Sequence, residues 1–367
     1  MKSLRSLLLA SAFLVGMCGG AFAAERNGVV VSIKPLHSLV SAVMQGVGEP
    51  KLIVQGAGSE HSYSLKPSDA EAIEHAKVIF WAGPSMETFL DKPIDTLGEG
   101  AKVVALGEAE GLTRLKFREG GPFEAHDHGD EGHDHGSEGH SHESHSHEGH
   151  SHEGHSHEGH DHAHDHSHDD DKKDDGHNHD HAAEAGKEGH HHHHGEYDLH
   201  FWLDPENGKV LVGDIANILS ESDPAHAEQY EKNAKDYAAK LDTLTKDVAA
   251  ELAPVKDKPF IVFHDAYQYF ENRFGVKAAG SITVSPEKAP GAARITQIHD
   301  KVKSLGATCV FSEPQFEPKL VSTVIDGTDA KTGVLDPLGA ELKDGPDLYP
   351  QLIRNLADSL KNCLSKS

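Results

Sequence analysis

Seven of the 32 histidines in this chain lie outside a histidine-rich stretch, and their positions single out three that could bind a metal ion. Four of the seven fall within or at the start of helical patterns, where a surface or hydrogen-bonded histidine is the simpler interpretation: His37, His75, His226 and His299. The other three, His61, His200 and His264, fall on predicted loops or strand ends. We take these three as candidate metal ligands.

Three neutral imidazoles form a suitable ligand set for Zn²⁺. They bind the ion at about 2.0 to 2.1 Å and leave one position of a tetrahedron open. Glu60 directly precedes His61 and could fill that position, whereas Asp336, at the end of a predicted strand, and a water molecule are the alternatives. The residues alone leave these three choices for the fourth ligand open.

The elements that would position these ligands follow an α/β pattern, in which short β-branched runs alternate with helical segments. In the first half of the chain, we predict strands at residues 29–33, 51–54, 78–81 and 102–106. Helices are expected near residues 36–47 and 68–76, and Ser68 with Glu71 reads as a capping box at the start of the second. These elements indicate one lobe with a parallel sheet.

A second lobe is predicted in the last third of the chain. Its expected strands are residues 259–264, 276–282, 308–311 and 332–336, and its last helix covers residues 348–360. The carboxyl ends of parallel strands face the crevice in which α/β proteins bind ligands. The loops and strand ends that carry the three histidines are therefore expected to meet there.

One long amphipathic helix is predicted between the lobes, because apolar residues recur at intervals of three and four from Ala227 to Val248. Asp223 is its expected N-cap and Pro254 its end. At about 1.5 Å per residue, such a helix spans roughly 45 Å. We expect two (β/α) lobes with parallel sheets, joined by one long rigid linker helix, and a metal site in the interlobe cleft.

A compositionally distinct stretch carries most of the formal net charge of −26. Residues 124–194 contain 20 acidic residues and three lysines, and so supply −17 of that total. Nucleic-acid binding needs clustered Lys and Arg, and we therefore expect no nucleic-acid partner.

Residues 126–194 consist almost entirely of His, Asp, Glu, Gly and Ser and hold no aliphatic side chain larger than Ala. Such a segment cannot form a packed core, and we predict a disordered insertion at residues 123–196. Its 25 histidines are expected to bind several Zn²⁺ ions weakly and, through tethering, to raise the zinc concentration near the cleft. A solvated spacer with incidental metal affinity is the alternative.

Residues 1–23 have the features of a cleaved signal peptide, because basic residues precede a short apolar run and a small-x-small pattern ends at Ala23. We expect a soluble periplasmic protein after cleavage. Removal of Cys18 with the leader leaves Cys309 and Cys363, and an oxidising compartment favours a disulfide between them.

These features predict six parts along the chain. They are a signal peptide at residues 1–23, an N-terminal α/β lobe at 24–122, the insertion at 123–196, the end of that lobe with the His200 motif at 197–222, the linker helix at 223–254 and a C-terminal α/β lobe at 255–367.

Three sequence motifs surround the candidate ligands: GSEHSY at residues 58–63, DLHFWLDP at 198–205 and FHDAYQYF at 263–270. With Ile33–Leu39, Ser312–Phe316 and Leu335–Gly339, they resemble the zinc-binding components of high-affinity bacterial zinc ABC importers. The resemblance covers nearly the whole mature chain and, in this order, the set of motifs is very specific.

The resemblance implies two lobes around a rigid helix, with zinc at their interface and three histidine ligands. It also implies that manganese-selective relatives carry a carboxylate where His264 stands, and a nitrogen ligand there favours zinc. It further implies a bridge at the positions of Cys309 and Cys363 and a His-rich and acidic loop between the first two histidine motifs. We take Glu60, His61, His200 and His264 as the ligands of one tight zinc site, with weaker sites in the insertion.

We therefore expect a protein that captures periplasmic Zn²⁺ and delivers it to the membrane permease, with its cytoplasmic ATPase, of an ABC importer. We expect a monomer that docks at the inner membrane without spanning it and catalyses no reaction. A receptor for Mn²⁺ or another divalent ion and a periplasmic zinc store are the alternatives. A zinc hydrolase lacks support from a His-Glu-x-x-His helix.

Overall fold

The computed structural model describes residues 28–118, 120, 123, 196–283, 286, 289–306 and 308–366. The predicted signal peptide with Cys18, and nearly all of the predicted insertion, lie outside these described residues. Within them, no helix combines the length and the hydrophobicity needed to cross a membrane.

The first sheet consists of four parallel strands in the order β2-β1-β3-β4: β1 (Gly28–Val31), β2 (Lys51–Leu52), β3 (Ala76–Trp81) and β4 (Lys102–Ala105). Three helices connect these strands: α1 (Lys34–Val43), α2 (Pro67–Glu74) and α3 (Thr88–Leu97). Nearly all of β3 is buried apolar surface, as expected for a central strand of a parallel sheet with both faces covered.

The predicted start of α2 is wrong by one residue, and its predicted capping box by two. The helix begins at Pro67, with Lys66 as its N-cap residue, and the Asp69 carboxylate accepts a hydrogen bond from the Lys66 backbone N–H at 2.9 Å. Proline favours the first helical position because its φ angle is already helical and it has no N–H to satisfy. Pro67 therefore fixes the start of the helix, and Ser68 lies inside it.

The second sheet has the corresponding parallel topology in the order β6-β5-β7-β8: β5 (Phe260–His264), β6 (Ala278–Thr283), β7 (Cys309–Ser312) and β8 (Lys331–Val334). Its connecting helices are α6 (Gln268–Phe274), α7 (Ala292–Leu305) and α8 (Lys319–Ile325). The two four-stranded parallel sheets confirm the predicted fold class.

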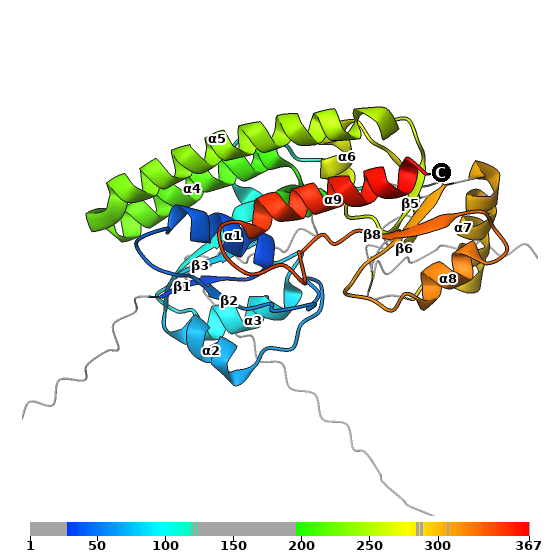
Figure 1. Cartoon of the computed structure of the whole chain (residues 1–367). Helices are drawn as coiled ribbons and strands as arrows, with labels where there is room; N and C mark the ends of the chain where they lie inside the picture. The colour runs from blue at the N-terminus through cyan, green and yellow to red at the C-terminus, as the bar shows by residue number, and fades with distance from the viewer. Residues whose placement is uncertain are drawn as a thin grey trace, which may run out of the picture. The chain divides into compact units, whose positions relative to one another are not determined.

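Three longer helices run beside the sheets: α4 (Pro205–Ser222), α5 (Ala227–Leu252) and α9 (Leu348–Leu364) (Figure 1). The 26 residues of α5 correspond to about 39 Å at 1.5 Å per residue. Its buried stripe has the predicted spacing of three and four: Tyr230, Ala234, Tyr237, Leu241, Leu244, Val248 and Leu252. Short 3₁₀ turns flank α5 at residues 224–226 and 253–255.

Helix α9 packs against α5 and also against α1, so the end of the chain returns to the first lobe. One apolar core includes side chains from both sheets together with α4, α5 and α9, and a smaller core lies between the second sheet and helices α7 and α8. A disulfide joins Cys309 in β7 to Cys363 in α9, as predicted. Closing a loop between residues 54 positions apart restrains the unfolded chain by about 4 kcal/mol.

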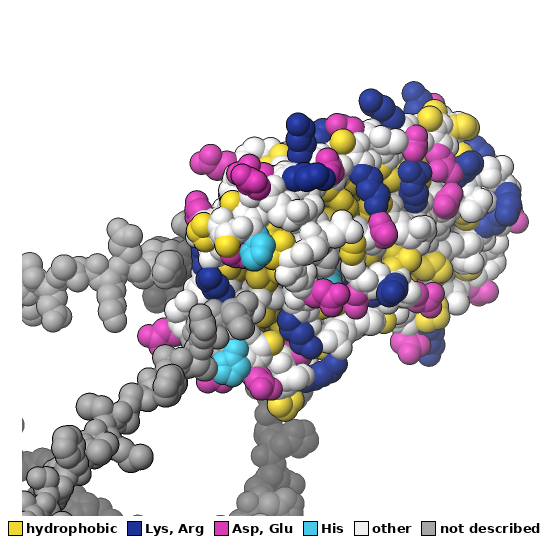
Figure 2. Space-filling view, turned by 60° about the vertical axis from the view of Figure 1, so that its left-hand side comes forward, with side chains coloured by type: hydrophobic (Ala, Val, Ile, Leu, Met, Phe, Trp, Pro, Cys, Tyr) yellow, Lys and Arg dark blue, Asp and Glu magenta, His cyan; other side chains and the backbone are white. Residues whose placement is uncertain are grey.

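Acidic and basic side chains are interspersed over the face shown in Figure 2, and that face carries no extended basic patch.

Candidate metal centre

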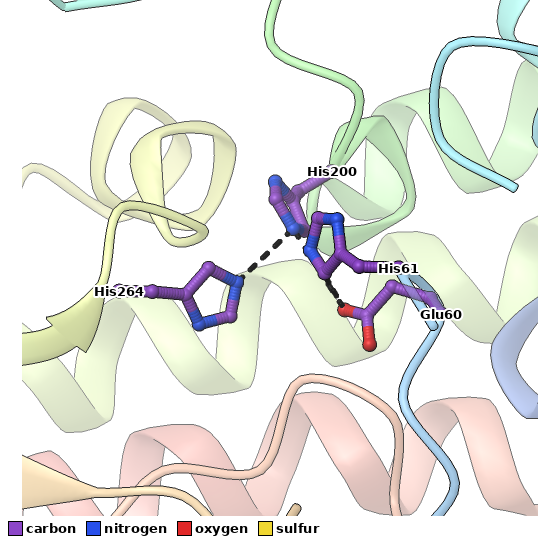
Figure 3. Close-up of side chains that lie close together, drawn as sticks. All are labelled: Glu60, His61, His200 and His264. Atoms are coloured by element: carbon purple, nitrogen blue, oxygen red, sulfur yellow. Dashed lines mark hydrogen bonds and ion pairs between the residues drawn. The ribbon is translucent and has the colours of Figure 1, made fainter. Parts of the chain in front are cut away.

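Four side chains from three separate segments converge in the structure (Figure 3). Glu60 and His61 lie in residues 53–66, a segment between β2 and α2 without helix or strand, which we call the Glu60 loop. His200 directly precedes a 3₁₀ turn at Phe201–Leu203, and His264 is the last residue of β5. Each of the four residues offers one ligand atom, and these atoms all lie within 4.8 Å of one another.

The distances suit a tetrahedral metal ion. Bonds of about 2.0 to 2.1 Å to such an ion imply ligand-to-ligand separations of about 3.3 to 3.4 Å. The Nε2 atoms of His200 and His264 are 3.3 Å apart. Glu60 Oε1 lies 3.8 Å from His200 Nε2 and 3.9 Å from His61 Nε2. The His200–His264 pair thus has the required spacing, and the Glu60 carboxylate would have to approach by about 0.5 Å.

A buried carboxylate orients His200. Asp198 Oδ1 lies 2.8 Å from His200 Nδ1 and also accepts the His200 backbone N–H at 2.9 Å. Burial raises the pKa of the Asp198 carboxyl to about 6, although hydrogen bonds from His200 and Gln268 act in the opposite direction. The contact directs His200 Nε2 toward the other candidate ligands, and a carboxylate at this position makes an imidazole a better metal ligand.

Glu313 has the same role toward His264. Its Oε2 lies 2.7 Å from His264 Nδ1, and the Tyr267 hydroxyl donates to its Oε1 at 3.0 Å. Burial disfavours a charged imidazole at His264, but the adjacent Glu313 carboxylate outweighs burial and raises the pKa of His264 to about 9. A metal ion bound at His264 would therefore have to displace a proton from the imidazolium form that Glu313 favours.

His61 differs from the other two histidines in its surroundings. Its side chain keeps 20% of its surface exposed, compared with 6% for His200 and 1% for His264. Burial of the ring atoms, together with the nearby His200 and His264, lowers the pKa of His61 well below its usual value of 6.5. A neutral imidazole is the form that binds a metal ion.

Asp336 is held in a different arrangement. Its Oδ1 accepts hydrogen bonds from Gln315 and from the backbone N–H groups of Leu338 and Gly339, and its Oδ2 accepts from Ala340 N–H at 2.6 Å. The carboxylate thereby orders the turn that follows β8. Among the described residues, the group that could share one ion contains Glu60 and not Asp336.

The four histidines interpreted as structural lie elsewhere. His37 Nε2 is 3.0 Å from Pro50 O, His226 Nδ1 is 2.7 Å from an Asp223 carboxylate oxygen, and His299 Nε2 is 3.0 Å from Asp326 O. His75 follows the last residue of α2.

Two further side chains lie close to His200 in the chain. Asp204 caps α4 by accepting the Glu206 N–H at 2.9 Å. Trp202 packs beside His200, with 5.4 Å between ring centroids, and its Nε1 donates to Pro337 O.

Asp198 and Glu313 had no predicted role. A signal for each is present in the chain. Asp198 lies two residues before His200, and Glu313 directly follows β7, the strand beside β5. A carboxylate at either position could hydrogen-bond to a metal-binding histidine. Neither position identifies a partner without the fold, because many acidic residues follow strands.

Comparison with known proteins gives consistent matches over the chain. The family model of the periplasmic zinc-uptake complex component A, ZnuA, matches residues 29–363. The high-affinity zinc uptake system protein ZnuA of Brucella suis biovar 1 (strain 1330) is 76% identical over 366 residues, which cover 100% of both chains.

Two solved structures show the same fold at low sequence identity. A crystal structure of ZnuA has a TM-score of 0.62 and 20% identity, covering 93% of this chain and 100% of that chain. The SBP FpvC from Pseudomonas aeruginosa in complex with Mn²⁺ has a TM-score of 0.64 and 18% identity, covering 93% of this chain and 99% of that chain.

Proposed function

This chain belongs to the periplasmic zinc-uptake complex component A family, and from that premise we propose that it captures Zn²⁺ and delivers it to an ABC-type zinc importer. Its high identity to a named zinc uptake protein over the full length supports zinc as the cargo. Export through the signal peptide, with cleavage after Ala23, would bring the mature chain to the periplasm.

The tight zinc site in this proposal consists of Glu60, His61, His200 and His264. The observation that carries it is the 3.3 Å separation of the His200 and His264 Nε2 atoms, the edge of a zinc tetrahedron, with Glu60 Oε1 within 3.9 Å of two imidazoles. Three nitrogens and one carboxylate oxygen complete a four-coordinate site. This occupancy leaves no open position for a reacting water, which supports a binding rather than a catalytic role.

The importer partner comprises a membrane permease and its cytoplasmic ATPase. The mature chain would dock as a monomer, with both lobes on the periplasmic face of the permease. Docking would disturb the ligand geometry and release the ion. The shared core around α4, α5 and α9 supports small lobe movements, because few residues between the lobes could absorb large backbone changes.

The histidine-rich insertion would supply weak zinc sites that feed the tight site. Because the insertion is part of the same chain, these sites would act at a high effective concentration relative to the tight site. Residues 126–194, with their 25 histidines, are the segment concerned.

A manganese receptor is the second candidate, favoured by one observation: FpvC, whose fold this chain shares, is described in complex with Mn²⁺. The ligand chemistry argues for zinc instead. Three imidazole nitrogens suit a borderline ion such as Zn²⁺, whereas Mn²⁺ prefers a larger share of oxygen ligands.

Zinc titration by calorimetry tests the proposal and separates it from a storage role. The mature chain would be compared with His200→Ala and with a deletion of residues 126–194. One tight site that is lost in His200→Ala and kept in the deletion is the expected result. Tight binding that survives His200→Ala and disappears with the insertion would identify a zinc store, and tighter binding of Mn²⁺ than of Zn²⁺ would identify a manganese receptor.

A further inference from the structure

The two chain segments that lead into and out of the insertion lie side by side, and we call Leu115–Arg118 and Glu196–Asp198 the insertion stem. Lys116 and Tyr197 form an antiparallel bridge. The Asp198 N–H donates to Leu115 O at 2.8 Å, and the Phe117 N–H donates to Glu196 O at 3.4 Å. The stem is therefore a short pair of antiparallel segments. Its second segment ends at Asp198, the residue that orients His200.

The stem is attached to helix α6, which follows the strand that carries His264. The Tyr269 hydroxyl accepts the Leu115 N–H at 3.1 Å and donates to Asp198 O at 2.6 Å. The Gln268 side-chain amide donates to Lys116 O at 3.0 Å and to Asp198 Oδ2 at 3.2 Å. These contacts join the first lobe's stem to the second lobe within a few residues of two candidate ligands.

Arg118 is the last residue of the first stem segment, and it joins the stem to the second lobe through four hydrogen bonds. Its guanidinium donates to both oxygens of Glu271 at 2.8 and 3.0 Å, and it pairs with both oxygens of Asp265, the residue directly after His264. The two carboxylate side chains are only 4% and 6% exposed, and Arg118 is 18% exposed. The Phe123 ring covers the guanidinium at 4.0 Å from its centroid.

The geometry points to Arg118 as a positioning residue. It joins the insertion stem to the segment that carries His264 and thereby holds the zinc site closed. This inference rests on the proposed zinc-binding function and adds a determinant of zinc release. Arg118 touches none of the four ligands, so its loss removes no metal bond. It would instead allow the His264 segment and the Asp198–His200 segment to separate more easily.

A second arginine on the same helix provides a matched control. Arg273 in α6 donates to both oxygens of Asp204 at 2.6 and 2.8 Å, and that carboxylate is fully buried, as the partners of Arg118 nearly are. Asp204 caps α4, and the Arg273–Asp204 ion pair includes no residue adjacent to a candidate ligand. Loss of Arg273 should therefore reduce stability through a similar buried ion pair and leave the metal geometry unchanged.

The test uses the mature chain with Arg118→Gln, Arg118→Lys and Arg273→Ala. Because Arg118→Gln leaves two buried carboxylates facing each other, a charge-balanced variant, Arg118→Gln with Glu271→Gln, is measured in parallel. Zinc release is followed by transfer to a chromophoric chelator, coordination geometry by the visible spectrum of the Co²⁺-loaded protein, and stability by thermal unfolding of the metal-free protein.

We expect zinc release to be about tenfold faster in both Arg118→Gln variants, with an altered Co²⁺ spectrum, because the segments that carry His200 and His264 would separate locally more often. Arg118→Lys should restore part of both properties. Arg273→Ala should unfold at a lower temperature than the parent protein. Its zinc release rate and Co²⁺ spectrum should match those of the parent protein.

Two results would overturn the inference. One is a charge-balanced variant that folds and keeps the normal release rate and spectrum. The other is an Arg273→Ala protein that releases zinc as fast as the Arg118 variants, since the effect would then be general loosening. If the parent protein has no tight zinc site that depends on His200, the result would instead contradict the proposed function itself.

Discussion

The two halves of the candidate zinc site are held in different ways. His264 ends strand β5, His200 directly precedes a 3₁₀ turn, and each imidazole contacts a buried carboxylate, Glu313 or Asp198. Glu60 and His61 lie in the Glu60 loop, which contains neither helix nor strand. One half is thus fixed by the fold before metal arrives, and the other is a chain segment that could complete or open the site.

We therefore expect the two halves of the site to contribute differently to zinc binding and to zinc release. The fixed half already has the spacing of two zinc ligands, whereas the Glu60 carboxylate is about 0.5 Å too far away. Coordination of one ion by both halves therefore requires the Glu60 carboxylate to approach His200 by about 0.5 Å. Changes to each half should consequently have different signatures.

The largest expected difference is between His264→Ala and His61→Ala. Both should remove one zinc ligand and weaken zinc binding, but His264→Ala also leaves the fully buried Glu313 carboxylate without its charge partner. Breaking a buried pair in this way costs about 3 to 5 kcal/mol. Urea unfolding of the metal-free proteins should show this loss for His264→Ala and less than about 1 kcal/mol for His61→Ala, a change typical of a partly exposed side chain. Equal losses would contradict the division into two halves.

The carboxylates of the fixed half should matter next. Glu313→Gln and Asp198→Asn keep all four ligands, and loss of such a partner typically lowers metal affinity 10- to 100-fold. Competition titration with a calibrated zinc chelator measures this change. Affinities within about twofold of the parent protein would show that these carboxylates do not tune the ligands.

A pH dependence should arise from the same half. The pKa of His264 is raised from 6.5 to about 9 in the folded protein, so its pairing stabilises the metal-free protein fully below about pH 6.5 and this contribution is lost as pH rises toward 9. Zinc binding at pH 7.5 should release about one proton, because the metal displaces the proton of His264. Calorimetry in buffers of different ionisation enthalpy counts that proton. Glu313→Gln should reduce the count, and an unchanged count would assign the proton to another group.

The smallest effect is expected for Asp336→Asn. This change weakens the hydrogen bonds that order the turn after β8 and should lower stability by about 1 kcal/mol. It should leave zinc affinity within about threefold of the parent protein, a difference below 1 kcal/mol. A loss of affinity as large as that of Glu60→Gln would instead make Asp336 a zinc ligand.

Local patterns in the sequence predicted the two sets of strands, the long helix and the three histidines that converge, but left the fourth ligand open among Glu60, Asp336 and water. The β-branched runs, the spacing along α5 and the placement of three histidines after strands or on loops each follow from a short stretch of chain. The predicted start of α2 at Ser68 was wrong because the backbone constraint of Pro67 outweighed the side-chain capping pattern.

Other features depend on contacts between distant segments, and the sequence did not predict them. Glu313 reaches His264 across 49 positions, and Arg118 reaches Asp265 across 147. Nothing in the residues near Arg118 distinguishes an exposed arginine from one held by two buried carboxylates. Their roles become visible only when the sheets bring these segments together.

The most direct test of the site is X-ray absorption at the zinc edge, recorded on the mature chain lacking residues 126–194 and loaded with one equivalent of Zn²⁺. We expect four light ligands at about 2.0 Å, three of them with the scattering pattern of imidazole, and loss of one imidazole in His61→Ala. A spectrum with fewer than three imidazoles, or one unchanged by His61→Ala, would contradict this expectation.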